Sequence, residues 1–188
     1  MSWKQWFNFS AKDDSAYLAY RTLVNQARAP QFYLNVGVPD TLDGRFDMIV
    51  MHMFLVIDRL SAEGPAADDL RQRLFDVMFD DMDQALRELG VGDLSVGKKV
   101  KTMARAFYGR LAAYDEAFRS EQSETMQEAL KRNVFAEIDV AEERLQALAN
   151  YMRQARETLR PISLEALSRG ESGFPPAPEA ILALEVRP

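Results

Sequence analysis

Apolar side chains recur at spacings of three and four residues along most of the chain, which is the period of an α-helix. Glycine and proline separate the periodic segments at Pro30, Gly64, Pro65, Gly90 and Pro161. No segment alternates with period two. We therefore expect an all-α fold, a single bundle-like domain of about six or seven helices with no sheet. The expected helices cover 14–28, 41–62, 66–89, 95–119, 123–131 and 134–160, with one or two further turns near 163–168.

The segment 41–62 is apolar nearly all round. Its stripe from Leu42 to Leu60 is complete, and Met48, Met51 and Leu55 make much of the opposite side apolar as well. Such a helix is central in a bundle, or it lines a groove. We expect it to be the most buried helix. Within the segment 95–119, Gly109 costs helix stability and suggests the close approach of a neighbouring backbone.

The two ends of the chain differ from the body. Residues 1–12 contain both tryptophans, Trp3 and Trp6, and either fold back on the body or contact a membrane interface. Residues 170–188 read as a Pro/Gly-containing linker and a flexible tail. The expected organisation is an N-terminal aromatic segment over 1–12, a helical domain over 13–169 and the tail over 170–188.

Composition removes several classes of function. The 188 residues include no cysteine and one histidine, which excludes zinc fingers, iron–sulfur clusters and a His-rich metal site. No cofactor is expected. The net charge of −6 disfavours binding to DNA. No apolar run reaches the length of a membrane span, and the N-terminus lacks the pattern of a signal peptide, so we expect a cytoplasmic protein.

Charge is distributed unevenly. Residues 94–114 contain five basic side chains and no acidic one, whereas 61–90 is strongly acidic. The basic run either pairs with the acidic helix before it or docks on an anionic surface. We expect Arg45 or Arg110 to pair with Asp80 or Asp83, because a half-buried pair of this kind holds its geometry through charge-assisted hydrogen bonds.

No motif for catalysis stands out. His52 lies among apolar neighbours and would need a nucleophile and an orienting acid to act as a base. A metal site at Asp76, Asp80 and Asp83 would need ligands from elsewhere. An enzyme with a carboxylate site or a His52-centred site remains the alternative to a binding protein. The nine methionines and eleven phenylalanines favour a surface that holds varied hydrophobic segments.

Several stretches together resemble the ubiquinol–cytochrome c chaperone family. They are Gly-Val-Pro-Asp-Thr-Leu-Asp-Gly-Arg-Phe-Asp-Met at 37–48, His52 with Asp-Arg-Leu at 58–60, and the stretches 79–83, 86–93 and 107–110. The resemblance covers about 15–160 and is that of a bacterial member. It implies a non-catalytic assembly factor for the respiratory cytochrome bc complex, located in the cytoplasm or peripherally at the inner membrane.

The resemblance also implies partners and a binding surface. Mitochondrial relatives bind newly made cytochrome b, work with a small co-chaperone and contact the ribosome. A chaperone should show an exposed groove lined by Met and Phe, and no enclosed polar pocket. We expect the loop at 37–44 to be ordered and to pack against the linker at 90–95. The client-binding residues are predicted to be Asp40, Thr41, Asp43, Arg45, Phe46, His52, Met53, Asp80, Asp83, Arg87, Lys98, Phe107, Tyr108 and Arg110, with membrane contact at Trp3 and Trp6.

Overall fold

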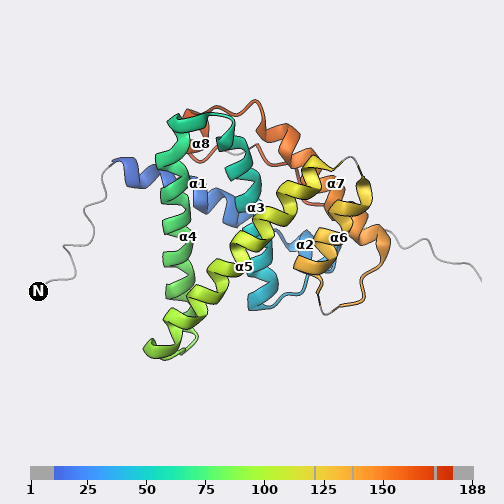
Figure 1. The fold of residues 1–188 in the computed structure, drawn as a ribbon, viewed down its shortest axis with the longest axis horizontal. Helices are drawn as coiled ribbons and strands as arrows, with labels where there is room; N and C mark the ends of the chain where they lie inside the picture. Colours follow the sequence, from blue (N-terminus) through green and yellow to red (C-terminus); the bar gives the residue numbers. More distant parts are fainter. Residues whose placement is uncertain (1–10, 121, 137, 172, 180–188) are drawn as a thin grey trace, which may run out of the picture.

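The computed structural model describes residues 11–120, 122–136, 138–171 and 173–179. These residues form helices and loops with no strand, which confirms the all-α prediction (Figure 1). Six long helices occur where the apolar period predicts them, but the last begins at Glu142 and not at 134 as expected, because the helix before it continues to Val134. They are α1 (Ala11–Ala27), α3 (Leu42–Ser61), α4 (Asp68–Glu88), α5 (Asp93–Arg119), α6 (Ser123–Val134) and α7 (Glu142–Leu159).

Three short helical segments complete the described part of the chain. They are α2 (Pro30–Leu34), the 3-10 helix η2 (Gly64–Ala67) and α8 (Leu164–Ser168). The stretch 30–34 lies outside the helices expected from the sequence, but it forms α2. Pro30 explains the difference, because a proline suits the first turn of a helix as well as it ends the preceding one.

Helix α3 is the centre of the fold, as its nearly complete apolar circumference predicts. Every residue from Phe46 to Val56 is buried, and α1, α5, α6 and α7 all pack against this helix. Its methionines, Met48, Met51 and Met53, are fully buried. The Met-rich stripe is therefore core and does not line an open groove. The sequence alone could not separate the two, because both require the same apolar pattern.

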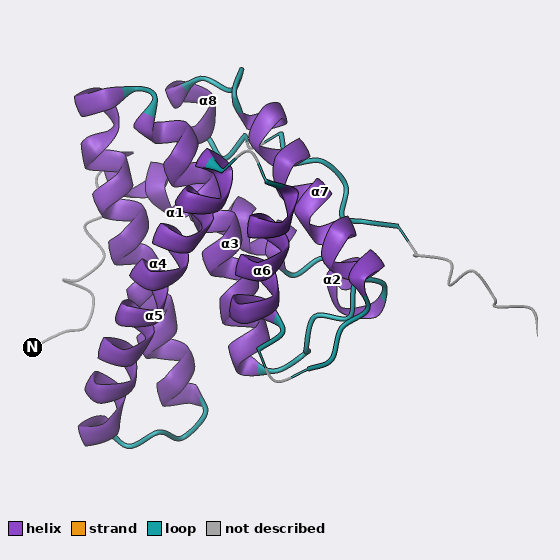
Figure 2. Ribbon diagram, turned by 45° about the vertical axis from the view of Figure 1, so that its right-hand side comes forward, coloured by secondary structure: helices purple, strands orange, loops and turns teal. Residues whose placement is uncertain are grey.

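Helices α4 and α5 form an antiparallel pair whose connecting turn projects away from the rest of the molecule (Figures 1 and 2). Gly90 has a φ of +79°, so it ends α4 in the left-handed conformation that favours glycine. No neighbouring backbone approaches Gly109 closely, although the sequence suggested it. Nothing lies within 4 Å of the place where its Cβ would be, so that prediction was wrong. The residue lies on the exposed face of α5.

The segment after α8 is held against the body. Gln26 donates a hydrogen bond to the Pro175 carbonyl, and Asn35 donates one to the Pro178 carbonyl. The Phe174 ring meets the edge of His52, with 5.2 Å between ring centroids. Residues 173–179 thus close one side of the core. Trp3 and Trp6, with residues 1–10, lie outside the described residues, as do residues 180–188.

Candidate functional site

The loop before α3 is held by several local contacts. Thr41 caps the helix, since its hydroxyl accepts a hydrogen bond from the Gly44 amide at 3.1 Å. Val36 and Val38 are buried, and the Val38 amide donates to the Phe32 carbonyl. Gly44 lies directly beneath the Pro39 carbonyl, where a Cβ would come within 2.1 Å of the oxygen. The loop is ordered, as predicted.

Three hollows adjoin this loop. We call the first the polar cavity, with a volume of about 470 Å³, and the second the apolar groove, of about 310 Å³. A third, of about 370 Å³, lies beside α2 and contains Asp40 and Arg45. Asp43 lines both the polar cavity and the apolar groove. The remaining lining of the apolar groove is Leu42, Leu86, Lys98, Lys99, Thr102 and Met103.

The polar cavity contains a buried ion pair. An Nη atom of Arg110 approaches Asp47 Oδ1 to 2.6 Å, and the two side chains are 20% and 9% exposed. Burial raises the pKa of Asp47 to about 7, although Arg110 acts to lower it. Arg110 also reaches over the Phe46 ring, 5.7 Å from its centroid. Pairing between Arg110 and Asp80 or Asp83 was predicted, and the prediction was wrong because Asp47 is the carboxylate that faces Arg110.

Unpartnered polar atoms gather around this pair. Within the described residues, four buried side-chain atoms have no hydrogen-bond partner, and they belong to Asp47 (Oδ1), Arg110 (Nε), Tyr114 (Oη) and Asn133 (Nδ2). Tyr114 is fully buried. This burial and the nearby charge of Asp47 both raise the pKa of its hydroxyl. The cavity therefore joins a charged pair to the amide of Asn133, whose N–H has no hydrogen-bond partner, and the Tyr114 hydroxyl is buried close to the same pair.

The predicted pairing of Arg45 with Asp80 or Asp83 was also wrong, because Arg45 and Asp83 pair with near neighbours in sequence. Arg45 pairs with Asp40 at 2.6 Å on the exposed loop, which lowers the pKa of Asp40. Asp83 pairs with Arg87 one helical turn further along α4, and Arg87 also reaches Asp93. These local pairs cost less side-chain entropy than pairs across the bundle. Asp80 remains on the outer face of α4, where partial burial and the charges of Asp76 and Asp83 raise its pKa.

Four predicted client contacts are instead core residues. Phe46, Met53 and Phe107 are buried, and His52 is fully buried. Its Nδ1 lies 2.8 Å from the Met48 carbonyl oxygen and its Nε2 lies 2.8 Å from the Tyr151 hydroxyl. Burial lowers the pKa of His52 to about 4. A catalytic base needs an open ring nitrogen, and both nitrogens here are engaged, so the geometry does not support a His52-centred site.

The outer face of α5 carries the remaining predicted residues. Lys98 borders the apolar groove, and Tyr108 is 58% exposed while its ring packs against Phe107 and Phe75. The linker at 90–95 does not pack against the loop as predicted. Leu94 is 95% exposed, and nothing lies near the Cβ positions of Gly90 and Gly92. The turn projects past the loop because α4 and α5 extend beyond the start of α3.

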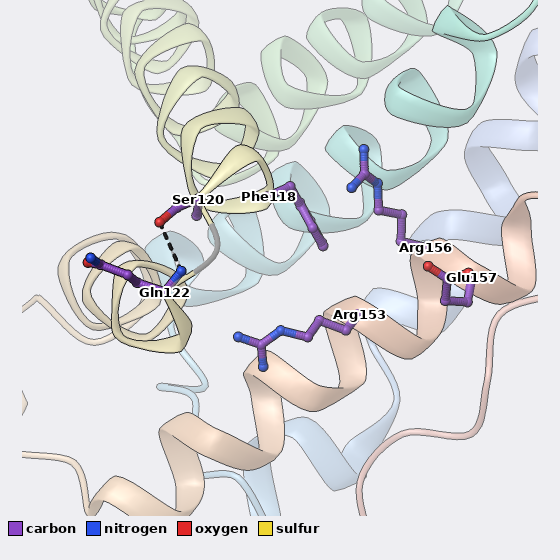
Figure 3. A pocket seen from close by; sticks show the side chains of 7 residues that line it. Phe118, Ser120, Gln122, Arg153, Arg156 and Glu157 are labelled. Carbon is purple, nitrogen blue, oxygen red and sulfur yellow. Dashed lines mark hydrogen bonds between the residues drawn. The ribbon is translucent and has the colours of Figure 1, made fainter.

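A separate hollow lies between the end of α5, the start of α6 and α7 (Figure 3). Arg156 spans this junction. It makes two hydrogen bonds with Asp58, at 2.8 and 3.0 Å, and its guanidinium lies 4.5 Å from the centroid of Phe118. Because its charge is already paired, we interpret Arg156 as a brace between α7, α3 and α5. No group of acidic or histidine side chains within the described residues is placed to hold a metal ion.

The described residues form a helical domain with hollows around the loop before α3. The family model described as ubiquinol-cytochrome C chaperone matches residues 34–174, and the chain therefore belongs to that family. A solved structure, the Cbp3 homolog from Brucella abortus, is similar with a TM-score of 0.78 and 37% identity, covering 89% of this chain and 92% of the other. No helix among the described residues is both long and apolar enough to cross a membrane.

Curated relatives agree with this assignment. Ubiquinol-cytochrome c reductase complex assembly factor 1 of Mus musculus is 25% identical over 153 residues, which is 81% of this chain and 52% of the mouse protein. The Homo sapiens protein of the same name is 25% identical over 166 residues, 88% of this chain and 55% of the human protein. The chain thus spans about half the length of these two relatives.

Proposed function

We propose that the protein is an assembly factor of the cytochrome bc complex that holds newly made cytochrome b. Membership of the chaperone family supports a role in assembly. The observation that carries the proposal is the position of the loop at 37–44, where a polar cavity and an apolar groove adjoin one another. The rim supplies exposed apolar side chains, since Leu42 and Ile138 are each 42% exposed.

The chemistry of such a client fits this surface. Subunits of a membrane complex expose apolar faces until their partners dock, and a binding protein can cover them only with apolar surface of its own. A charged rim keeps that surface in solution, and here Asp43, Lys98 and Lys99 border the groove. The groove is small, so it accommodates side chains of a client segment, and the neighbouring cavity receives polar groups of the same segment.

Photocrosslinking in cells tests this proposal. A photoreactive phenylalanine analogue at Leu42 or Ile138 is expected to crosslink to cytochrome b, because both side chains lie at the rim of the loop surface. The matched control is Tyr17 on α1, which is 51% exposed and distant from the loop in sequence. Crosslinking to cytochrome b from Tyr17 at the same yield as from Leu42 and Ile138 would refute the assignment of this surface.

We also infer that the outer face of α5 contacts anionic lipid. Lys98, Lys101 and Arg105 are exposed at spacings of three and four residues, so they form one stripe. Leu94 and Tyr108 flank this stripe with exposed apolar surface, and no acidic residue occurs in α5 between 94 and 114. A stripe of this composition suits the interface of a bilayer, where each basic residue near the surface contributes about 1 kcal/mol.

Vesicle sedimentation tests the lipid contact. The triple variant with Lys98, Lys101 and Arg105 changed to Glu is expected to bind vesicles of phosphatidylcholine with phosphatidylglycerol roughly 100-fold more weakly than the unmodified protein. The control reverses Arg119, Arg160 and Arg169, which alters the net charge equally on other exposed positions. Equal losses in the two variants would show that net charge, and not the α5 stripe, governs binding.

A further inference from the structure

Several buried polar atoms around the polar cavity have no hydrogen-bond partner within the chain. A buried polar atom without a partner costs about 1–3 kcal/mol, and native proteins retain few of them. Here all four such atoms of the described residues belong to one cluster around Asp47 and Arg110. The ion pair supplies Asp47 Oδ1 with a counter-charge, but it leaves Arg110 Nε, Tyr114 Oη and Asn133 Nδ2 without a partner. A group from outside the chain can supply the missing partners.

The chemical types of these atoms restrict the partner. Arg110 Nε and Asn133 Nδ2 can only donate, whereas the carboxylate oxygen of Asp47 accepts. An anion would meet the donors but approach the Asp47 carboxylate. A cation would meet Asp47 but approach the Arg110 guanidinium. A neutral amide presents a carbonyl oxygen and an N–H side by side, so it can serve both sets of atoms without bringing a second charge into a buried site.

The walls of the cavity suit the carbon atoms beside an amide. Pro39, Val134, Phe135 and Ile138 line it together with Asp47, Arg110 and Asn133. Its volume of about 470 Å³ lies within the range of sites that bind small ligands. The Arg110 side chain is 20% exposed, whereas its Nε and the other unpartnered atoms are buried, so an amide in the cavity reaches them when the side chains in the wall turn toward it. These features resemble the combination of apolar lining and few convergent polar groups that orients a ligand.

We propose that the polar cavity binds a neutral amide group of a client segment, either a peptide bond or the carboxamide of an Asn or Gln side chain. This inference rests on the proposed function, because it specifies which part of a client the loop surface recognises. The amide carbonyl accepts from Arg110 and Asn133, and the amide N–H donates to Asp47. The side chain next to the amide lies against Phe135 and Ile138.

Nuclear magnetic resonance on the full chain tests the proposal with a small probe. N-acetyl-leucine amide carries neutral amides beside an apolar side chain, whereas N-acetyl-leucine replaces one with a carboxylate and isoamylamine supplies a cation. We expect the first compound to shift the side-chain N–H signals of Asn133 and Arg110, with an affinity at least about tenfold higher than either charged compound. Absence of these shifts would mean that water alone occupies the cavity and would overturn the proposal, as would equal affinity for all three compounds.

The variant Asn133→Leu separates binding from folding. It removes an unpartnered donor while keeping a similar volume, so we expect the melting temperature to stay the same or rise. Binding of N-acetyl-leucine amide should nevertheless weaken about tenfold, because the amide oxygen loses one donor. The control Gln127→Leu removes a carboxamide that is already hydrogen-bonded to Gln146 on α7, away from the cavity, and should leave probe binding unchanged. Unchanged binding in Asn133→Leu would contradict the proposal.

The two proposals fail in different ways. Crosslinks from Leu42 or Ile138 to cytochrome b without probe binding would support cytochrome b as the client and refute the amide site. Probe binding without those crosslinks would support the amide site and refute cytochrome b as the source of the amide.

Discussion

Arg110→Met is expected to lower the free energy of unfolding by about 3–5 kcal/mol at pH values well above 7, because there it leaves the carboxylate of Asp47 buried without its counter-charge. The side chains of Arg110 and Asp47 are only 20% and 9% exposed, so solvent screens the charge weakly. Urea denaturation followed by circular dichroism measures the change. The control is Arg45→Met, which breaks the exposed pair with Asp40 and should have little effect.

The loss in Arg110→Met should depend on pH in a defined direction. The pKa of Asp47 is raised from 3.8 in the unfolded chain to about 7 in the folded protein, so the folded state retains a proton that the unfolded state releases between these values. Stability from this group is therefore present at acidic pH and is lost as pH rises toward 7. Removing Arg110 raises this pKa further.

The cost of Arg110→Met should accordingly shrink as pH falls to 7 and below, where Asp47 carries its proton in the variant and increasingly in the unmodified protein. Combining Arg110→Met with Asp47→Asn should recover much of the loss at alkaline pH, since no buried charge then remains. If Arg110→Met were as stable as Arg45→Met at every pH, the ion pair would have no role in holding α5 against α3.

Gly44→Ala is expected to destabilise the protein by about 2–3 kcal/mol, opposite in sign to the usual effect of alanine in a helix. The added Cβ would lie 2.1 Å from the Pro39 carbonyl oxygen, a backbone atom that cannot move without shifting the loop. Because that loop forms a wall of the polar cavity, the variant should also weaken crosslinking from Ile138.

Gly109→Ala is the matched control for Gly44→Ala. Both glycines lie within helices and lack a positive φ, but Gly109 faces open space. Alanine there should raise stability by about 1 kcal/mol through its higher helix propensity. Thermal and urea unfolding of both variants measure the two effects. Stabilisation by both substitutions would show that the Pro39 contact relaxes at no cost.

The local features of the fold were accessible from the sequence. The six long helices follow from the apolar period, and several of their ends follow from residues such as Pro30 and Gly90, since these effects act within a few residues. The start of α7 at Glu142 was missed, because no glycine or proline marks it. The central position of α3 follows from its apolar circumference. A side-chain oxygen just before the first turn of α3 is available from Asp40 or from Thr41, and the structure shows that Thr41 is the cap.

The pairing of charges depended on the tertiary structure. Several carboxylates stood within reach of Arg110 in any plausible bundle, and only the crossing of α5 over α3 brings Asp47 to it. Asp47 occurs in the stretch that carried the family resemblance, and Tyr114 follows Arg110 by one helical turn, but neither signal identifies a cavity. Asn133 gave no signal, because it comes from the end of α6, whose position relative to α5 is not encoded locally.

The burial of apolar residues likewise depended partly on the sequence and partly on the tertiary structure. A helical period marks which residues share a face, and Phe107 and Tyr114 lie on the buried face of α5, although Phe107 was predicted to contact a client. The period does not state whether a neighbour covers the face, so Met53 and His52 appeared equally suited to a core or to a groove. Their burial was decided by α7 and by the segment at 173–179, which pack against α3 from far along the chain.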